Sequence, residues 1–261
     1  MIIPEELIEK LKSCQKLVVL TGAGVSSESG IPTYRDALVG LWKDFDFKKL
    51  ASVEGFLENP ASVWGWYVSR RQKLRTVKPN PAHEVIAKLE SLVPEFVLIT
   101  QNVDDLHERA GSKNIIHLHG SITKAFCIDC KASYSLPDVD LEEVKDICEQ
   151  AIDLPVCLSC GGKIRPGVVW FGEQVPQNDL GDAEVHCMEA DLLLIIGTSG
   201  LVYPAANLPY LASMSKVTIV QINLEVTDFD SITNYNFKNQ AGELMLLLYE
   251  AAFSSPWFVG P

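Results

Sequence analysis

The chain has 261 residues, 47% of them hydrophobic and 21% charged, which is enough for one large domain or for a domain with a smaller module. Its formal net charge of −12 at pH 7 repels phosphate backbones, so nucleic acid is not expected as a direct partner. The first residues, MIIPEELIEKLK, lack the apolar core of a secretory signal, and no apolar run approaches the roughly 20 residues of a membrane span. We therefore expect a soluble, cytoplasmic protein.

Short apolar segments alternate with amphipathic segments along the chain, which predicts strands alternating with helices. Strands are expected at the continuously apolar runs 16–21, 95–100, 114–120, 191–199 and 216–223. Helices are expected at the amphipathic runs 5–13, 82–93, 181–190, 204–214 and 240–252. Continuously apolar strands suit a parallel sheet that is buried on both faces, so the predicted fold class is α/β with a Rossmann-like open parallel sheet.

Two stretches interrupt this alternation, and we interpret them as insertions that form a smaller module. Residues 31–80 are rich in aromatic residues and mostly helical in pattern. Residues 123–164 contain two CxxC pairs on either side of an acidic helix candidate. A strand-like alternation returns at 165–173, RPGVVWFGE, which has polar residues at both ends.

A glycine-rich turn, GAGVSSESG, follows the first predicted strand. Gly22, Ala23 and Gly24 would let backbone N–H groups approach a pyrophosphate. Ser27 stands where the dinucleotide fingerprint GxGxxG requires its third glycine, so a tight turn without a ligand is equally consistent with the pattern. Arg35, in the following GIPTYRD, could clamp a phosphate or lie on the surface.

Polar residues also follow two later strands. Gln101, Asn102 and Asp104 come directly after 95–100, and ligands of open α/β sheets bind at the carboxyl ends of strands. These side chains could hydrogen-bond a carboxamide or order a water, or they could form a turn and cap the next helix. The glycine-rich stretch 197–205, GTSGLVYPA, is a second candidate nucleotide contact at a strand end.

Two histidines lie in IIHLHGS. His117 and His119 are expected on one face of a strand, because their spacing is two residues. His119 precedes Gly120 at the end of that strand, where a general base would be reachable, and it could equally be a packed histidine. His117 is expected to be packed.

The two CxxC pairs are the strongest local signal. Cys127 with Cys130, and Cys157 with Cys160, could complete a tetrahedral zinc site with four sulfur ligands. Four thiolates leave no open coordination position, so this zinc would be structural. Unpaired thiols or a redox pair are the alternatives.

The segment WGWYVSRRQ places aromatic residues beside two arginines. Tyr67 and Arg70 are three residues apart, so a helix puts them on one face. One interpretation is a half-buried helix whose arginines extend to water. The other is a pocket for a negatively charged ligand. Arg71 points elsewhere on such a helix and is expected to be solvated.

Eight motifs, in this order, resemble those of the sirtuins, the NAD-dependent protein deacylases: GAGVS, GIPTYR, QNVD, HG, the CxxC pairs, VVWFGE, GTSGLVYPA and QINLE. The resemblance runs over residues 16–248. It implies a Rossmann-like NAD-binding domain made of residues 1–30, 81–122 and 165–261. It also implies a helical insertion at 31–80 and a zinc-binding module at 123–164. One departure is Tyr34, where the family usually has phenylalanine.

The resemblance implies a set of site residues, with NAD as cofactor and zinc as a structural ion. His119 would be the general base, and Asn102 would share in catalysis. The residues implied for NAD, from the phosphates to the adenosine end, are Gly22, Ala23, Gly24, Ser26, Arg35, Trp42, Gln101, Asn102, Asp104, Gly197, Thr198, Ser199, Asn223, Glu225 and Ala241. An acyl-lysine protein or peptide would add as a strand along Val169, Phe171, Gly200 and Val202.

The Tyr-x-x-Arg pair resembles that of the class III sirtuins, which remove succinyl, malonyl or glutaryl groups. Tyr67 and Arg70 would bind the acyl carboxylate, and Ala37 looks like the small residue that widens the pocket. In the mechanism this implies, the acyl oxygen displaces nicotinamide and His119 accepts a ribose hydroxyl proton. Free lysine and O-acyl-ADP-ribose are the products.

Other functions remain open at this point. A plain deacetylase would use the same residues with a different acyl pocket. An NAD glycohydrolase or ADP-ribosyltransferase would consume NAD at the same site without acyl-lysine. A catalytically idle NAD sensor is disfavoured by His119 and Asn102, and an NAD(H) dehydrogenase is disfavoured by the missing GxGxxG.

Overall fold

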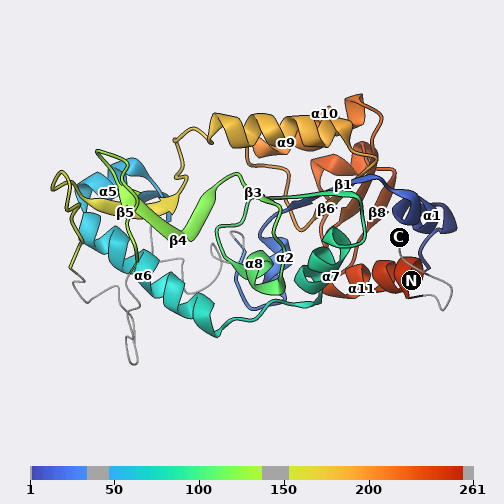
Figure 1. The fold of residues 1–261 in the computed structure, drawn as a ribbon, viewed down its shortest axis with the longest axis horizontal. Coiled ribbons are helices and arrows are strands. Elements are labelled where there is room, and N and C mark those ends of the chain that lie inside the picture. Colours follow the sequence, from blue (N-terminus) through green and yellow to red (C-terminus); the bar gives the residue numbers. More distant parts are fainter. Residues whose placement is uncertain (1, 34–46, 137–152, 255–261) are drawn as a thin grey trace.

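A computed structural model describes residues 2–33, 47–136 and 153–254 (Figure 1). Its centre is a six-stranded sheet with the strand order β3-β2-β1-β6-β7-β8, in which every pair is parallel. The strands are β1 Lys16–Thr21, β2 Glu95–Thr100, β3 Ile115–His117, β6 Leu192–Ile196, β7 Thr218–Ile222 and β8 Tyr235–Phe237. The chain proceeds from β1 toward one edge and from β6 toward the other. Their junction is therefore the topological switch point, where open α/β sheets bind ligands.

Helices cover both faces of this sheet. Along β1, Leu17 and Val19 pack into one core and Val18 and Leu20 into the other, as the two-residue period of a strand requires. The first core is completed by α1 Glu5–Ser13, α7 Pro81–Glu90 and α11 Ala241–Phe253. The second core is completed by α9 Gln177–Glu189 and α10 Leu208–Met214, the latter preceded by the 3-10 turn η2 Ala205–Asn207. Burial on both faces explains why the strands are continuously apolar in sequence.

A smaller unit lies beyond the β3 side of the sheet, to the left in Figure 1. It contains the antiparallel pair β4 Gly120–Cys127 and β5 Ile164–Val168, together with α4 Phe47–Leu50, α5 Val53–Glu58 and α6 Pro60–Thr76. The start of α6 is set by Pro60 at its first turn and by Asn59, whose side chain accepts a hydrogen bond from the backbone N–H of Ser62 at 3.1 Å. Residues 34–46 and 137–152 are outside the described residues, and with them Arg35, Ala37, Trp42 and the acidic helix candidate.

The prediction of one strand over 114–120 is wrong. Strand β3 ends at His117, and a turn at Leu118 and His119 leads into β4. Gly120 has φ +72°, and a Cβ on it would lie 2.3 Å from the carbonyl oxygen of Gly167. The chain therefore leaves the sheet here through a conformation that favours glycine. His117 and His119 consequently do not share a strand face.

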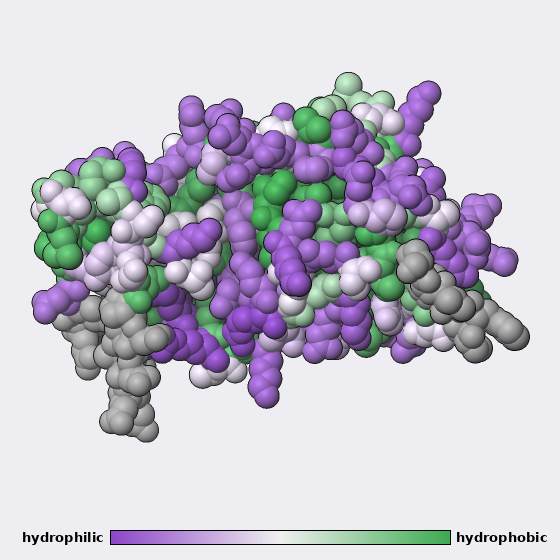
Figure 2. All heavy atoms as spheres, viewed as in Figure 1, coloured by the Kyte–Doolittle hydropathy of each residue, from purple (hydrophilic) through white to green (hydrophobic). Residues whose placement is uncertain are grey.

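Three short helices complete the described chain: α2 Gly24–Ser27, α8 Leu106–Ala110 and η3 Asp228–Ser231. Most of the face in Figure 2 carries hydrophilic side chains, in agreement with the charged composition. Within the described ranges, none of the helices combines the length and the apolarity that crossing a bilayer requires.

Candidate active site

Two glycine turns meet at the switch point of the sheet. One follows β1 and the other follows β6, and the Gly24 N–H donates to the Gly197 carbonyl at 2.8 Å. A Cβ on Gly22 would lie 2.8 Å from Thr198 Cα, and a Cβ on Gly24 would lie 2.7 Å from Gly197 Cα. Both glycines are thus required for the turns to approach one another. The two stretches predicted as nucleotide contacts are therefore neighbours in the fold, at the edge where a phosphate would meet backbone N–H groups.

Ser26 lies at the centre of a buried polar network beneath these turns. Its hydroxyl donates to Asp104 Oδ2 at 3.1 Å and accepts from the Asn102 amide at 3.1 Å. His83 Nδ1 accepts the backbone N–H of Asn80 at 3.3 Å, so Nε2 carries the ring proton, 3.4 Å from Ser26 Oγ. The Ser26 hydroxyl of the first motif is therefore joined to Asn102 and Asp104 of the second.

His83 is a member of this network that the sequence does not reveal. Nothing marks it there, because it is the third residue of α7 and its partner Ser26 lies 57 positions earlier. Burial lowers the pKa of His83 to about 4, so the ring is neutral at pH 7. A second buried histidine, His107, packs against it with ring centroids 4.7 Å apart, and burial lowers its pKa as well. The neutral His83 ring serves as a fixed N–H donor to Ser26.

Asp104 is the acidic group of this network. Burial raises its pKa, while the hydrogen bonds from the Leu106 N–H, at 3.1 Å, and from Ser26 oppose that rise. The guanidinium of Arg70 on α6 is close enough for its charge to interact with this carboxylate. The interaction connects the smaller unit with the polar network at the sheet.

His119 occupies the turn between β3 and β4. Its Nδ1 lies 3.0 Å from the Gln101 carbonyl oxygen, which can only accept, so Nδ1 carries the proton and Nε2 keeps its lone pair. Burial lowers the pKa of His119 and the hydrogen bond to Gln101 opposes this. Gln101 is itself held by a bond from its Nε2 to Thr198 Oγ1 at 2.9 Å. A neutral imidazole with an unprotonated Nε2 is the form that a general base requires.

His117, by contrast, pairs with Glu108 Oε1 through Nε2 at 2.9 Å. The two histidines that the sequence placed on one face thus have different partners and different surroundings.

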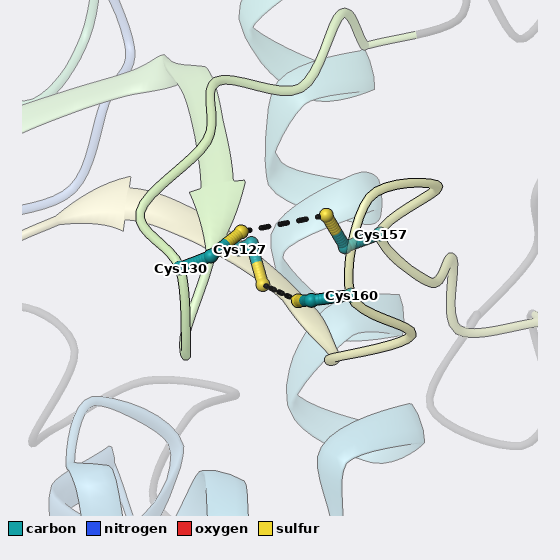
Figure 3. A group of neighbouring side chains, drawn as sticks. All are labelled: Cys127, Cys130, Cys157 and Cys160. Carbon is teal, nitrogen blue, oxygen red and sulfur yellow. Dashed lines mark hydrogen bonds between the residues drawn. The ribbon is translucent and has the colours of Figure 1, made fainter.

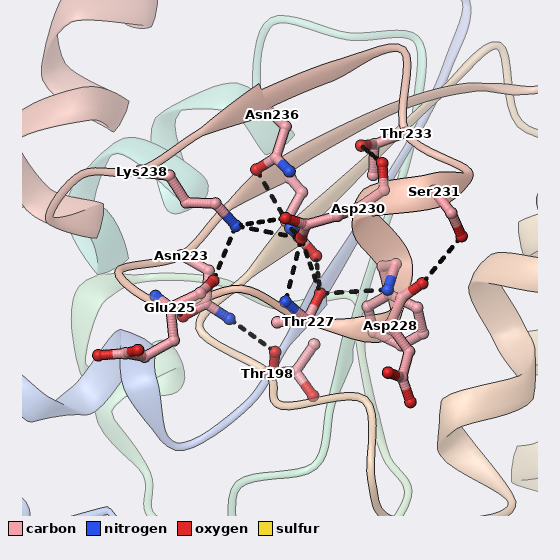
Figure 4. Close-up of polar contacts among 12 residues, drawn as sticks. Thr198, Asn223, Glu225, Thr227, Asp228, Asp230, Ser231, Thr233, Asn236 and Lys238 are labelled. Carbon is pink, nitrogen blue, oxygen red and sulfur yellow. Dashed lines mark hydrogen bonds and ion pairs between the residues drawn. The ribbon is translucent and has the colours of Figure 1, made fainter.

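The loop after β7 carries Asn223 and Glu225 (Figure 4). Asn223 Nδ2 donates to the Thr198 carbonyl at 2.7 Å, which joins this loop to the second glycine turn. Lys238 Nζ donates to the Glu225 carbonyl at 2.8 Å and pairs with Asp230 Oδ2 at 2.8 Å. The loop is therefore fixed from both sides.

Ala241 begins α11 next to the first glycine turn. The Gly242 N–H donates to Glu28 Oε1 at 2.9 Å, so a carboxylate from the segment after α2 caps the positive end of the α11 dipole. The residues predicted for the adenosine end thus lie on elements tied to the glycine turns at the carboxyl edge of the sheet.

The four cysteines form one cluster near the ends of β4 and β5 (Figure 3). The Sγ atoms of Cys127 and Cys160 are 3.5 Å apart, those of Cys130 and Cys157 are 3.6 Å apart, and all four lie within 4.8 Å of one another. A disulfide requires about 2.05 Å, whereas a tetrahedron with Zn–S bonds of about 2.3 Å separates its sulfurs by about 3.8 Å. The donor set therefore fits a structural zinc, which would join the two CxxC loops.

Tyr67 and Arg70 lie on one face of α6, as their spacing predicts. Tyr67 is 4% exposed and its hydroxyl accepts a hydrogen bond from Trp170 Nε1 at 2.9 Å. The Arg70 guanidinium lies 4.5 Å from the Trp66 ring centroid. Burial lowers the pKa of Arg70, and its electrostatic interactions with Tyr67 and Asp104 oppose this. The helix is half-buried, and the charge of Asp104 in the active-site network acts on its Arg70.

Arg71 is not solvated as predicted. Its guanidinium lies 5.0 Å from the Trp64 ring centroid, and burial lowers its pKa to about 10. Trp66 precedes Arg70 by four positions and Trp64 precedes Arg71 by seven, which are one and two turns of a helix. The aromatic residues of α6 are therefore placed to cover both guanidinium groups.

Comparison with known proteins identifies the family. Residues 22–204 match the Sir2 family, a range that includes both glycine turns and all four cysteines. The chain belongs to the Sir2 family.

Relatives and solved structures agree with this assignment. The NAD-dependent protein deacylase of Methylococcus capsulatus is 48% identical over 247 residues, 95% of this chain and 96% of that protein. NAD-dependent protein deacylase 1 of Pseudomonas aeruginosa is 47% identical over 250 residues, 95% of this chain and 98% of that protein. The structure of a Sir2 homologue–NAD complex superposes with a TM-score of 0.87 at 41% identity, covering 96% of this chain and 94% of that one.

A structure of Sir2 with a p53 peptide and NAD+ superposes with a TM-score of 0.81 at 34% identity, covering 95% of this chain and 98% of that one. In the present Sir2 family member, exposed apolar side chains lie on the two segments predicted to flank a peptide: Phe171 is 52% exposed, Leu201 63% and Val202 40%. The Val169 N–H donates to the carbonyl oxygen of His119 at 2.9 Å, so the first of these segments adjoins the turn that holds the candidate base.

Proposed function

We propose that this chain removes acidic acyl groups, such as succinyl and malonyl, from protein lysines in preference to acetyl. The protein is an NAD-dependent protein deacylase with a structural zinc. The observation that supports the acidic preference is the placement of a buried phenol and a guanidinium, Tyr67 and Arg70, on one helix face of α6. A carboxylate that enters there gains charge-assisted hydrogen bonds from groups already held in place.

The two glycine turns, with Arg35 and Trp42, are the proposed contacts of the NAD phosphates. Ser26, Gln101, Asn102 and Asp104 would hold the nicotinamide end, and Asn223, Glu225 and Ala241 the adenosine end. When bound, NAD supplies the ribose carbon that loses nicotinamide and the hydroxyl groups that receive the acyl group, giving O-acyl-ADP-ribose as product. The fixed hydrogen bonds around Ser26 mean that the pocket is organised before the cofactor arrives.

His119 is the proposed general base. Because the Gln101 carbonyl fixes the proton on Nδ1, the lone pair of Nε2 is available to accept a proton from a ribose hydroxyl. Its lowered pKa keeps it unprotonated at neutral pH. The acyl-lysine peptide would lie as an added strand between segments 169–171 and 200–202, where backbone hydrogen bonds give affinity with little demand on sequence.

The test is kcat/KM for one peptide bearing either succinyl-lysine or acetyl-lysine, with NAD, and with both products identified by mass. A large succinyl preference with O-succinyl-ADP-ribose as product supports the proposal. A preference for acetyl leaves a plain deacetylase, and NAD consumption with neither peptide processed indicates a glycohydrolase.

A further inference from the structure

The hydrogen bond between Trp170 and Tyr67 has only one possible direction. An indole Nε1 can donate and cannot accept, so the Tyr67 oxygen is the acceptor of the 2.9 Å bond. Both residues are buried, with exposed fractions of 2% and 4%. They lie 103 positions apart in the sequence, on the segment after β5 and on α6. The contact is therefore a tertiary link between the proposed peptide-binding segment and the proposed acyl pocket.

This direction leaves the proton of Tyr67 to be donated elsewhere. Burial raises the pKa of Tyr67 to about 12, against the opposing effects of the Trp170 hydrogen bond and the charges of Arg70 and Arg165, so the phenol stays protonated at neutral pH. Arg70, one helical turn along, also has only donors. Together they present two kinds of donor, which suits the oxygens of a carboxylate and offers nothing to the methyl group of an acetyl chain.

The indole that orients Tyr67 is itself held by two neighbouring side chains. The Arg165 guanidinium stacks on it, 3.6 Å from the ring centroid, and Phe56 packs with its centroid 5.3 Å away. Arg165 forms a two-bond ion pair with Glu173, at 2.5 and 2.8 Å, and Glu173 also accepts the backbone N–H of Trp170 at 2.8 Å. The ring and its backbone are thus fixed by the same carboxylate–guanidinium pair.

We propose that Trp170 is a specificity-determining positioning residue, which holds the Tyr67 hydroxyl so that its proton points to the acyl carboxylate. The inference rests on the proposed preference for acidic acyl groups. It assigns to the VVWFGE segment a role in recognising the acyl chain, in addition to its proposed role as an edge for the peptide. In this role the Trp170 indole acts on the acyl carboxylate through the Tyr67 hydroxyl and not by a contact of its own.

A double-mutant cycle tests this role. Trp170→Phe, Tyr67→Phe and the double variant are assayed for kcat/KM on matched succinyl-lysine and acetyl-lysine peptides. We expect Trp170→Phe to lower the succinyl-to-acetyl ratio by about three- to ten-fold, the range of one oriented hydrogen bond. The loss should appear in KM for the succinyl peptide. In the Tyr67→Phe background, the addition of Trp170→Phe should cause no further change in the succinyl-to-acetyl ratio.

Trp64→Phe is the matched control. Trp64 is 3% exposed on α6 and packs in a different cluster, beside Arg71, so its replacement removes a buried indole without reaching Tyr67. It should leave the ratio unchanged. A second measurement needs no Trp170 variant: the indole 15N–1H resonance of Trp170 in the intact protein should shift on Tyr67→Phe and on addition of the succinyl peptide to the unsubstituted protein.

The outcomes separate this inference from the function on which it rests. If the unsubstituted enzyme shows no succinyl preference, the acidic-acyl function fails and this role of Trp170 fails with it. If the preference is present and Trp170→Phe lowers kcat/KM equally for both peptides, only the inference is overturned. The same holds if Trp170→Phe lowers the succinyl-to-acetyl ratio as much in the Tyr67→Phe background as in the unsubstituted protein.

Discussion

Replacing Arg70 with methionine removes one charged group from the proposed acyl pocket and keeps a side chain of similar length. In the structure this guanidinium lies 4.5 Å from the Trp66 ring centroid, on the helix face of Tyr67. Truncating one partner of a desolvated, hydrogen-bonded charge pair costs about 2–5 kcal/mol. That cost corresponds to a roughly 30- to 4,000-fold loss in kcat/KM for a succinyl-lysine peptide. An acetyl-lysine peptide has no acyl carboxylate for Arg70 to bind, so its kcat/KM should fall far less.

The assay is steady-state kcat/KM for the two peptides, with products resolved by mass. Arg71→Met is the matched control, because it removes a guanidinium from the next position of the same helix, where it lies over the Trp64 ring. It should leave the succinyl-to-acetyl ratio unchanged. Arg70→Lys should recover part of the loss, since an ammonium keeps the charge without the planar fork. Equal losses on both peptides for Arg70→Met would show that Arg70 only stabilises the helix.

Three further predictions concern the base, the zinc cluster and the buried imidazoles. His119→Ala should lower deacylation by about 10²- to 10⁴-fold and leave NAD affinity by calorimetry nearly unchanged; retained turnover would place the base elsewhere. The Cys130→Ser protein should contain no zinc by metal analysis and should unfold at a lower temperature. The Cys14→Ser protein, changed in the sheet core, should still contain zinc. A stable, active, zinc-free Cys130→Ser protein would refute the zinc assignment. Because the pKa of His83 is about 4 when folded and about 6.5 when unfolded, its contribution to stability is complete above pH 6.5 and is lost as the pH falls toward 4. At about 1.4 kcal/mol per pH unit this is a loss of about 3 kcal/mol in the free energy of unfolding. In urea titrations at a series of pH values, His83→Asn should make the free energy of unfolding fall less steeply as the pH is lowered. An unchanged slope of this free energy against pH would contradict the prediction.

Much of the sheet could be predicted from the sequence, because each buried strand is a short apolar run bounded by polar residues. The bounds of α1, β1 and β2 agree with the predicted ranges 5–13, 16–21 and 95–100. The strands β6 and β7 are shorter than predicted, because the predicted ranges include residues of the adjoining turns. Strand β8 was missed because its three residues, Tyr235–Phe237, include a polar one and form no apolar run.

The parts of the site that depend on contacts between distant residues could not be predicted. Ser26, Asn102 and Asp104 were found through their motifs, but the hydroxyl that joins them to His83 does so only once β1, β2 and α7 are packed. The bond from Trp170 to Tyr67 likewise joins two motifs that the sequence presents separately. Local periodicity carries information about faces of helices and strands, and it carries none about which side chains meet across the core.

The most direct test of the acidic-acyl preference is a crystal structure of the protein with NAD and a succinyl-lysine peptide. We expect the succinyl carboxylate within about 3 Å of both the Tyr67 hydroxyl and the Arg70 guanidinium, the distance of a charge-assisted hydrogen bond. A succinyl carboxylate that points into solvent, with Tyr67 and Arg70 still packed against Trp170 and Trp66, would contradict this placement.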